Sequence, residues 1–449
     1  MVVNKNRIYK YIFFLIISLM TIFNGGNSNL IIQINFIIIS FFFLFLNREK
    51  NYQAQMKTIF FNNKIIIYFY FLFIIFIIFQ TIPLPLEWIK VLSPEKYNFL
   101  NKLNFNGTLA TISLNSSNSF FSLLNYVSLF LFLIIFKSLF RKTTDIFKFY
   151  YFIVSLGALT SSIAIYLFLI GNPDFWILTN SGYKQAATGF FINRTVFSCF
   201  LVLCFFCGIE YLKLIDDQSR DTTRNFFKKI YVRIFILLIT IGIITSFSRL
   251  GNFLFISLIA IQIAQSLFTN NKKNKLFLWT LILIVIFDVL ILGFYFGSEK
   301  LFQRYLFLKN DINQYIPLIN DQSLSRGNLS KFAVNEIKNF IFFGYGGGGF
   351  EYLLKINYKP LSVNFASHAH SDLIEFIGEY GVIGSLLIFL SILFTCIKNN
   401  IFFILKNIFF FYFLFLILIF DFSLHIPIIQ FLLIILFSIK YKKYENIIT

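Results

Sequence analysis

The chain has 449 residues, of which 58% are hydrophobic and only 13% are charged, and its formal net charge is +19 at pH 7. Soluble globular proteins carry about 25% charged residues, so this composition excludes an ordinary water-soluble enzyme or binding domain and indicates that most of the chain lies in lipid. Lysine supplies most of the basic charge in a sequence strongly biased toward Phe, Ile and Asn, so the net charge does not by itself indicate an anionic partner, and we expect no nucleic acid.

The apolar residues fall in blocks long enough to cross a membrane. A hydrocarbon core of about 30 Å needs about 20 residues of helix. Residues 1–23 resemble a signal peptide but lack a small-residue cleavage site, so we interpret them as containing a retained first span. Twelve spans are predicted, near residues 8–23, 29–46, 64–82, 118–138, 147–170, 189–211, 231–247, 250–268, 277–296, 373–396, 402–420 and 425–440.

The distribution of Lys and Arg predicts the orientation of these spans. With a cytoplasmic N-terminus, most basic residues fall in the inner loops and in both tails, as the positive-inside rule requires. Two long segments then lie outside, residues 83–117 and residues 297–372. The predicted fold is an all-α polytopic membrane protein with about 12 transmembrane helices and one large extracytoplasmic loop, and loops of that length usually bind or catalyse.

Three arginines occupy predicted outer positions. Arg194 follows Asn193 at the outer start of a span, Arg249 lies in a very short turn between two spans, and Arg326 lies in the large outer loop. Each alone could be a snorkelling or solvated side chain. Together they could converge on an anion, because a planar guanidinium binds phosphate oxygens through two parallel hydrogen bonds.

The three histidines of the chain are all predicted on the outer side. His368 and His370 lie in "ASHAHSDL", and His425 lies in "DFSLHIP". His370 stands where the outer loop enters a span, and an imidazole with a pKa near ~6.5 can take a proton from a sugar hydroxyl. A metal site at His368 and His370 is the alternative, but Asp372 is the one acid at ligand spacing nearby, so we expect no metal.

The segment "GYGGGG" at residues 344–349 formally fits a dinucleotide-binding pattern, but no strand of a βαβ unit precedes it. We instead expect a tight turn with positive φ angles and amides available to an anion, which makes Gly346 and Gly348 candidate substrate-binding residues. Further on, Gly378, Gly381 and Gly384 recur at three-residue intervals, which predicts the close approach of a neighbouring helix.

Several segments together resemble the O-antigen ligase and polymerase family of bacterial membrane glycosyltransferases. They are "GFFINRTVFSCFL", "SFSRLG", "SRGNLSKFAVNEIKNFIFFGYGGGGF", "HSDLIEFIGEYGVIG" and "DFSLHIP", and they cover residues 189–440 best. "QTIPLPLEW" and "ISLNSS" are similar to the first outer loop of that family. Two residues depart from its pattern, since Ser371 stands in place of a commoner Asn and Leu250 where Gly often follows the arginine.

The resemblance implies a division of the chain and an activity. Residues 1–188 would be N-terminal spans with the first periplasmic loop, residues 189–440 the ligase-like core, and residues 441–449 a cytoplasmic tail. Arg249 and Arg326 would bind the diphosphate of an undecaprenyl-linked glycan. His370 would deprotonate the acceptor hydroxyl, without a metal or another cofactor.

The same resemblance implies the partners and the location. Arg194, Asn193 and His368 would contact substrate in a site that faces the periplasm from a bacterial inner membrane. The acceptor would be lipid A core, a growing polysaccharide or a protein. The alternative function is a polysaccharide or lipid transporter or flippase, for which Asp288, the one acid deep within a predicted span, would be the first candidate ion site.

Overall fold

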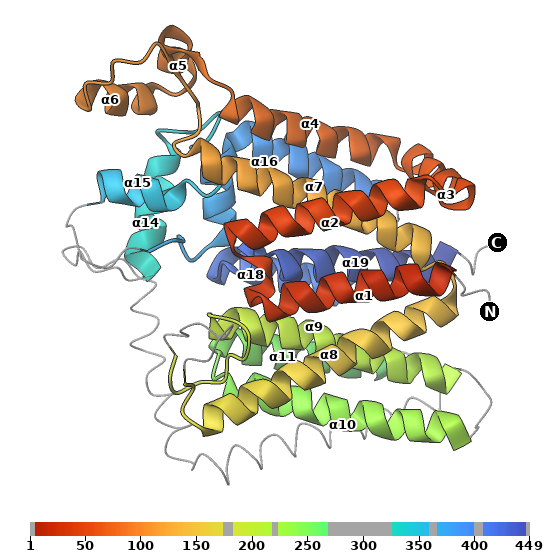
Figure 1. The fold of residues 1–449 in the computed structure, drawn as a ribbon. Coiled ribbons are helices and arrows are strands. Elements are labelled where there is room, and N and C mark those ends of the chain that lie inside the picture. The colour runs from red at the N-terminus through yellow and green to blue at the C-terminus, as the bar shows by residue number, and fades with distance from the viewer. Residues whose placement is uncertain are drawn as a thin grey trace. The chain divides into compact units, whose positions relative to one another are not determined.

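The computed structural model describes residues 5–173, 183–217, 223–267, 326–358, 366–398 and 407–445, and these residues are mainly α-helical (Figure 1). Within them the strands are β1 (Leu84–Pro85) and β2 (Leu109–Ala110), which pair antiparallel in the predicted first outer loop. The predicted all-α class is therefore confirmed.

Six helices of the described residues are long and apolar enough to cross a membrane. They are α2 (Asn29–Asn47), α4 (Lys64–Thr81), α7 (Ser116–Leu139), α8 (Thr143–Leu169), α9 (Arg194–Asp217) and α16 (Asp372–Lys398). Shorter apolar segments lie in α11 (Arg249–Leu267), α18 (Ile408–Phe420) and α19 (Pro427–Glu445), and α1 (Lys5–Ile22) and α10 (Thr223–Thr245) cover two further predicted spans. The predicted span near 277–296, with Asp288, lies outside the described residues, so the count of twelve stays a prediction.

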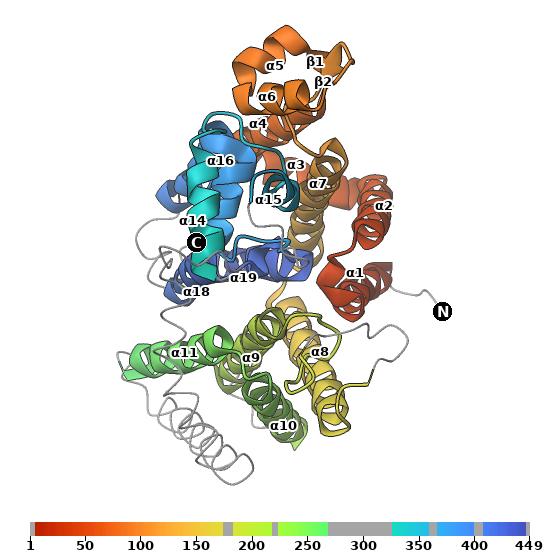
Figure 2. The same ribbon diagram turned by 90° about the vertical axis from the view of Figure 1, so that its left-hand side faces the viewer.

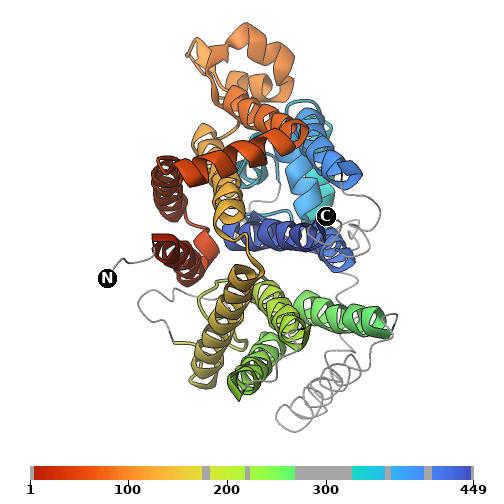
Figure 3. The same ribbon diagram turned by 90° about the vertical axis from the view of Figure 1, so that its right-hand side faces the viewer.

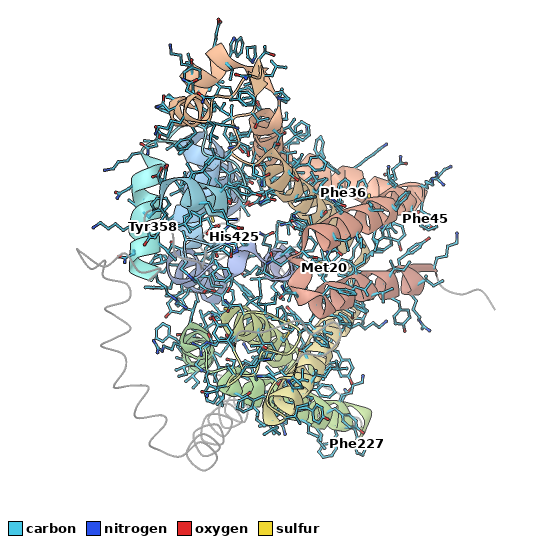
Figure 4. All side chains as sticks on the ribbon, turned by 60° about the vertical axis from the view of Figure 1, so that its left-hand side comes forward. Met20, Phe36, Phe45, Phe227, Tyr358 and His425 are labelled. Atoms are coloured by element: carbon cyan, nitrogen blue, oxygen red, sulfur yellow. The ribbon has the colours of Figure 1, made fainter. Side chains whose placement is uncertain are left out.

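Large apolar side chains on the outer faces of the helices explain why the protein needs lipid. Phe45 of α2 and Phe227 of α10 are each more than half exposed, whereas Met20 of α1 is fully buried (Figure 4). Extended apolar surfaces of this kind are unfavourable in water but are solvated by acyl chains. The chain is a multi-pass membrane protein.

The chain folds into two compact units, each built from separate stretches of sequence. Unit 1 comprises Met1–Ser28, Leu139–Phe307 and Ile426–Thr449, and unit 2 comprises Asn29–Ser138 and Leu308–His425. The boundary predicted at residue 188 separates the N-terminal spans from the ligase-like core, which is a different division from these two units. That boundary stays a prediction.

Unit 1 is a helical bundle around α9. It contains α1, the short helix η1 (Asn24–Gly26), α8, α9, α10, α11 and α19. The helices α8, α9 and α10 pack against one another, and α11 packs against α9 (Figure 2). Gly157 of α8 makes this possible, because a Cβ there would overlap Cys204 of α9. The apolar side chains of α9 are buried from Val196 to Leu212, as expected for the centre of a bundle.

Unit 2 carries most of the predicted site residues. Besides α2, α4, α7, α16 and α18 it contains α3 (Lys50–Asn62), α5 (Leu86–Leu92), α6 (Pro94–Lys102), α14 (Arg326–Ile337), α15 (Phe350–Asn357) and η2 (Ser423–His425). The helix α16 packs along α4 and against α14 (Figures 1 and 3). The short helices α5, α6, α14 and α15 gather at one end of the long helices, and α3 lies at the other end (Figures 1 and 2).

The helix α16 is interrupted at Gly381, where φ is +61°. A Cβ at this position would overlap the carbonyl of Phe342, and a Cβ at Gly378 would meet the ring of Tyr345. A Cβ at Gly384 would meet Phe76 of α4. The predicted close approach of a helix is thus found at Gly384, whereas Gly378 and Gly381 admit the loop before α15 instead.

Candidate functional site

The glycine turn, residues 344–349, has the predicted backbone. Gly344, Gly346 and Gly348 have φ angles of +71°, +88° and +64°, a region that glycine adopts without steric cost. A Cβ at Gly346 would overlap the hydroxyl of Ser113. The run of glycines is therefore needed for both backbone conformation and close packing.

The amides of this turn are used within the protein, which corrects the expectation that they stay free for an anion. Gly346 N donates to the backbone oxygen of Glu379 at 2.9 Å, and Gly348 N donates to its side-chain Oε1 at 2.6 Å. On the other side, Ser119 Oγ of α7 donates to the carbonyl of Gly347 at 3.1 Å. The turn is a rigid support, and the binding of substrate by Gly346 and Gly348 stays a prediction.

His370 is held in an unusual backbone conformation directly before α16. Its φ is +58°, a value that costs a non-glycine residue free energy. Its two neighbours fix it, since Ser330 Oγ of α14 donates to the carbonyl of Ala369 and Ser371 Oγ donates to the carbonyl of Leu418 in α18. Strain maintained by its surroundings in this way is typical of functional residues.

The surroundings of His370 favour a neutral imidazole. Its ring packs edge-on against Phe422 with centroids 5.3 Å apart, and its Nδ1 is buried with no hydrogen-bond partner among the described residues. The pKa of His370 is lowered to about 4. Burial of the ring is the largest cause, and the positive charge of Arg326 and the nearby His368 lower the pKa further. The ring is therefore neutral, and able to accept a proton, at physiological pH.

The structure also brings the other two histidines together with these residues. The ring of His368 stacks on Phe422 with centroids 4.5 Å apart and lies 5.0 Å from the ring of His425. His368 Nδ1 hydrogen-bonds Glu375 Oε1 at 2.9 Å. Arg326, the first residue of α14, acts electrostatically on both His370 and the buried Asp421. The predicted outer histidines and Arg326 thus form one cluster in unit 2.

Three carboxylates of this cluster were missed by the sequence analysis. Asp372, Glu375 and Glu379 are almost completely buried along the first turns of α16. Their spacing of three and four residues places them on one helix face. That spacing was a usable signal, because acids inside an apolar span are costly and usually have a specific role. We name these three residues the α16 carboxylates.

The cluster also raises the possibility of a bound metal ion. Three side chains each offer one atom that could bind a metal ion, and these atoms lie within 4.8 Å of one another: they belong to His368, Glu375 and His425. However, His425 Nδ1 hydrogen-bonds Asp372, and His425 Nε2 lies 3.5 Å from Glu375 Oε1. Contacts from both ring nitrogens to carboxylate oxygens favour hydrogens at these positions. The expected absence of a metal stays a prediction.

In unit 1, Arg194 and Arg249 are the first residues of α9 and α11. The starts of these helices are adjacent, because a Cβ at Gly251 would overlap Ser198. The Arg194 guanidinium lies over the ring of Tyr183 at 4.9 Å. Two arginines at two neighbouring helix N-termini create a positive region suited to an anion.

Asn193 and Ser248 explain why the two helices begin at these arginines. Asn193 Oδ1 accepts a hydrogen bond from Thr195 N at 2.7 Å, and Ser248 Oγ accepts one from Gly251 N at 3.2 Å. Both are typical helix caps. Asn193 thus has a structural role, and its contact with substrate stays a prediction. Arg249 belongs to unit 1, whereas His370 and Arg326 belong to unit 2, so their predicted convergence also stays a prediction.

Comparison with known proteins identifies the central part of the chain. Residues 234–389 match the family model described as O-Antigen ligase. The matched stretch includes Arg249, Arg326, His370, the glycine turn and the α16 carboxylates, whereas Arg194 and His425 lie outside it. A search of curated proteins and a search of solved structures found no match. The match identifies residues 234–389 as an O-antigen ligase domain, in agreement with the resemblance of the motifs along residues 189–440.

Proposed function

We propose that the protein transfers a glycan from undecaprenyl diphosphate to an acceptor hydroxyl on the periplasmic face of a bacterial inner membrane. The acceptor is the core of lipid A, a growing polysaccharide or a protein side chain. The observation that carries the proposal is the state of His370, a neutral imidazole with a buried, unpartnered nitrogen beside Arg326, within an O-antigen ligase domain. A buried polar atom without a partner suits a ligand that supplies one.

The residues support a transfer in a single displacement. His370 takes the proton of the acceptor hydroxyl while that oxygen bonds to the anomeric carbon. The bond from the anomeric carbon to the diphosphate oxygen breaks, and the electron pair leaves with undecaprenyl diphosphate. Arg249 and Arg326 stabilise the charge that develops on the diphosphate, so the proposed step needs no divalent metal.

A reconstituted transfer reaction tests this function. Purified protein is incubated with lipid-linked oligosaccharide and each candidate acceptor, and undecaprenyl diphosphate and product are measured with and without chelator. We expect release of the diphosphate lipid that depends on the correct acceptor and is unchanged by chelator. Loss of activity on chelation would contradict the metal-independent mechanism.

The same reaction separates transfer from the alternative of a transporter or flippase. In detergent solution there is no second compartment, so a transporter would leave the glycan on its carrier lipid. An unchanged donor with every acceptor class, from protein that remains folded, would favour the transporter.

A further inference from the structure

The α16 carboxylates share a regular pattern of contacts. Each of Asp372, Glu375 and Glu379 is at most 2% exposed, in a helix whose other residues are mostly apolar. Burying an ionised carboxylate is unfavourable unless charged or hydrogen-bonding partners replace water. The partners of these three residues therefore decide whether this end of α16 is stable.

One oxygen of each carboxylate lies near the same imidazole, that of His425. His425, labelled in Figure 4, is the last residue of η2, which contacts α16. Asp372 Oδ1 hydrogen-bonds His425 Nδ1. Glu375 Oε1 and Glu379 Oε2 lie 3.5 and 3.8 Å from His425 Nε2. His425 is thus the common partner of all three.

The second oxygen of each carboxylate accepts a hydrogen bond from the backbone of a different loop. Asp372 Oδ2 accepts from Leu424 N at 2.8 Å, in the turn that contains His425. Glu375 Oε2 accepts from Ala369 N at 2.9 Å, directly before His370. Glu379 Oε1 accepts from Gly348 N at 2.6 Å, in the glycine turn. The three loops are therefore connected to one another through the α16 carboxylates.

The geometry favours a charged His425. Ionised carboxylates can only accept hydrogen bonds, so Asp372 Oδ1 at Nδ1 and the oxygens of Glu375 and Glu379 within 3.8 Å of Nε2 favour a hydrogen on each ring nitrogen. Burial alone would lower the pKa of His425, but Glu375 and Asp372 outweigh it and raise the pKa well above its usual value. The imidazolium supplies positive charge among three acids and lets them remain hydrogen-bond acceptors.

We propose that His425 is a positioning residue: a protonated imidazole that, through the α16 carboxylates, holds the segment before His370, the glycine turn and its own turn in one arrangement. His425 lies outside residues 234–389, where the family model matches. The proposal rests on the proposed function only in treating His370 as the base whose position matters. The charge of His425 and its connection to the three loops are inferred only from the contacts of the α16 carboxylates with His425 and with the loop amides.

Nitrogen-15 NMR of histidine tests the charge directly. The chain has three histidines, so selective labelling gives a simple spectrum of the protein in lipid nanodiscs. At neutral pH we expect a signal from the His425 ring with hydrogens on both nitrogens, and this signal should disappear in His425→Gln. If that variant does not fold, spectra of His368→Gln and His370→Gln assign the signal by elimination. A neutral His425, or a metal-bound nitrogen that chelator releases, would overturn the proposal.

Hydrogen exchange tests the links between the loops. In His425→Gln we expect faster amide exchange of residues 346–349, 367–371 and 422–425 together, and His425→Lys should restore part of the protection because it keeps a positive charge. Glu351→Gln is the matched control, since Glu351 pairs with Lys355 on the partly exposed helix α15. Unchanged exchange in His425→Gln, or changes confined to its own turn, would contradict the proposal.

Kinetics then test positioning as opposed to general stability. His425→Gln should lower kcat by about 10²-fold, as expected when a catalytic group is misplaced by about 1 Å, while the KM for the lipid-linked donor stays close to normal. His425→Lys should recover part of kcat. Full activity of His425→Gln would contradict the positioning role. The NMR and exchange measurements use no substrate, so they distinguish this failure from a failure of the proposed function.

Discussion

Arg249 and Arg326 are expected to act through the shape of the guanidinium as well as its charge. Arg249→Lys and Arg326→Lys each keep a positive charge but lose the two parallel hydrogen bonds to phosphate. Loss of one charge-assisted hydrogen bond costs about 1.5–3 kcal/mol, so kcat/KM should fall by about 10- to 10²-fold. Arg233→Lys, on the exposed face of α10, is the matched control and should change nothing. Activity of both site variants equal to that of the control would show that charge alone suffices.

The lowered pKa of His370 predicts an unusual pH dependence. The proton-accepting form is present above a pKa of about 4 and is lost below it. Activity should therefore stay constant from pH 8 down to about pH 5 and fall only at lower pH, whereas a histidine near ~6.5 would already lose activity at pH 6. Arg326→Gln removes a positive neighbour and should move the acidic limit upward. Folding must be followed at each pH, and a limit near pH 6.5 in the wild type would contradict this description of His370.

At the scale of single elements, the backbone conformation and close packing of the glycine turn predict that a side chain at Gly344 destabilises the protein. Gly344→Ala places a side chain at φ +71° and against the backbone oxygen of Glu379, which cannot move independently of α16. Gly171→Ala provides the control, because Gly171 has φ +86° but open space around it. The backbone strain costs about 1–2 kcal/mol at either position. Gly344→Ala should therefore lower Tm further than Gly171→Ala, and equal losses would show that packing of the turn against α16 is unimportant.

The elements that the sequence predicted well are those with strong local signals. Apolar blocks predicted a helix at every span within the described residues, and the glycine run at 344–349 predicted its positive φ angles. The short helices and paired strands within residues 83–117 were not predicted, because they have little periodic apolar pattern.

The sequence predicted some of the residues that belong to the candidate site but not which of them contact one another. His370, His368 and Arg326 were identified from residue type and predicted side of the membrane, and they lie in one cluster. The partners of Asp372 and Glu379 are Leu424 and Gly348, which are 52 and 31 residues away along the chain. No local pattern specifies such a pairing, although three acids at helical spacing in an apolar span indicated that partners must exist.

At the scale of the whole molecule, the orientation in the membrane is the prediction on which the site depends. Both termini should be cytoplasmic and residues 297–372 periplasmic, because Lys and Arg partition in that way. Alkaline phosphatase fused near Asn310, which lies outside the described residues, should be active, and a fusion after residue 445 should be inactive. An inactive fusion near Asn310 would place the His370 cluster on the wrong side of the membrane for a periplasmic acceptor.

The central claim is that His370 acts as the base in transfer of a lipid-linked glycan. The most direct measurement compares wild-type protein and His370→Ala in nanodiscs, following both binding of the lipid-linked donor and release of undecaprenyl diphosphate in the presence of acceptor. Because loss of a general base typically lowers the rate by about 10² to 10⁴, His370→Ala should bind the donor normally and turn it over at that reduced rate. Near-normal release of the diphosphate lipid by His370→Ala would contradict the account.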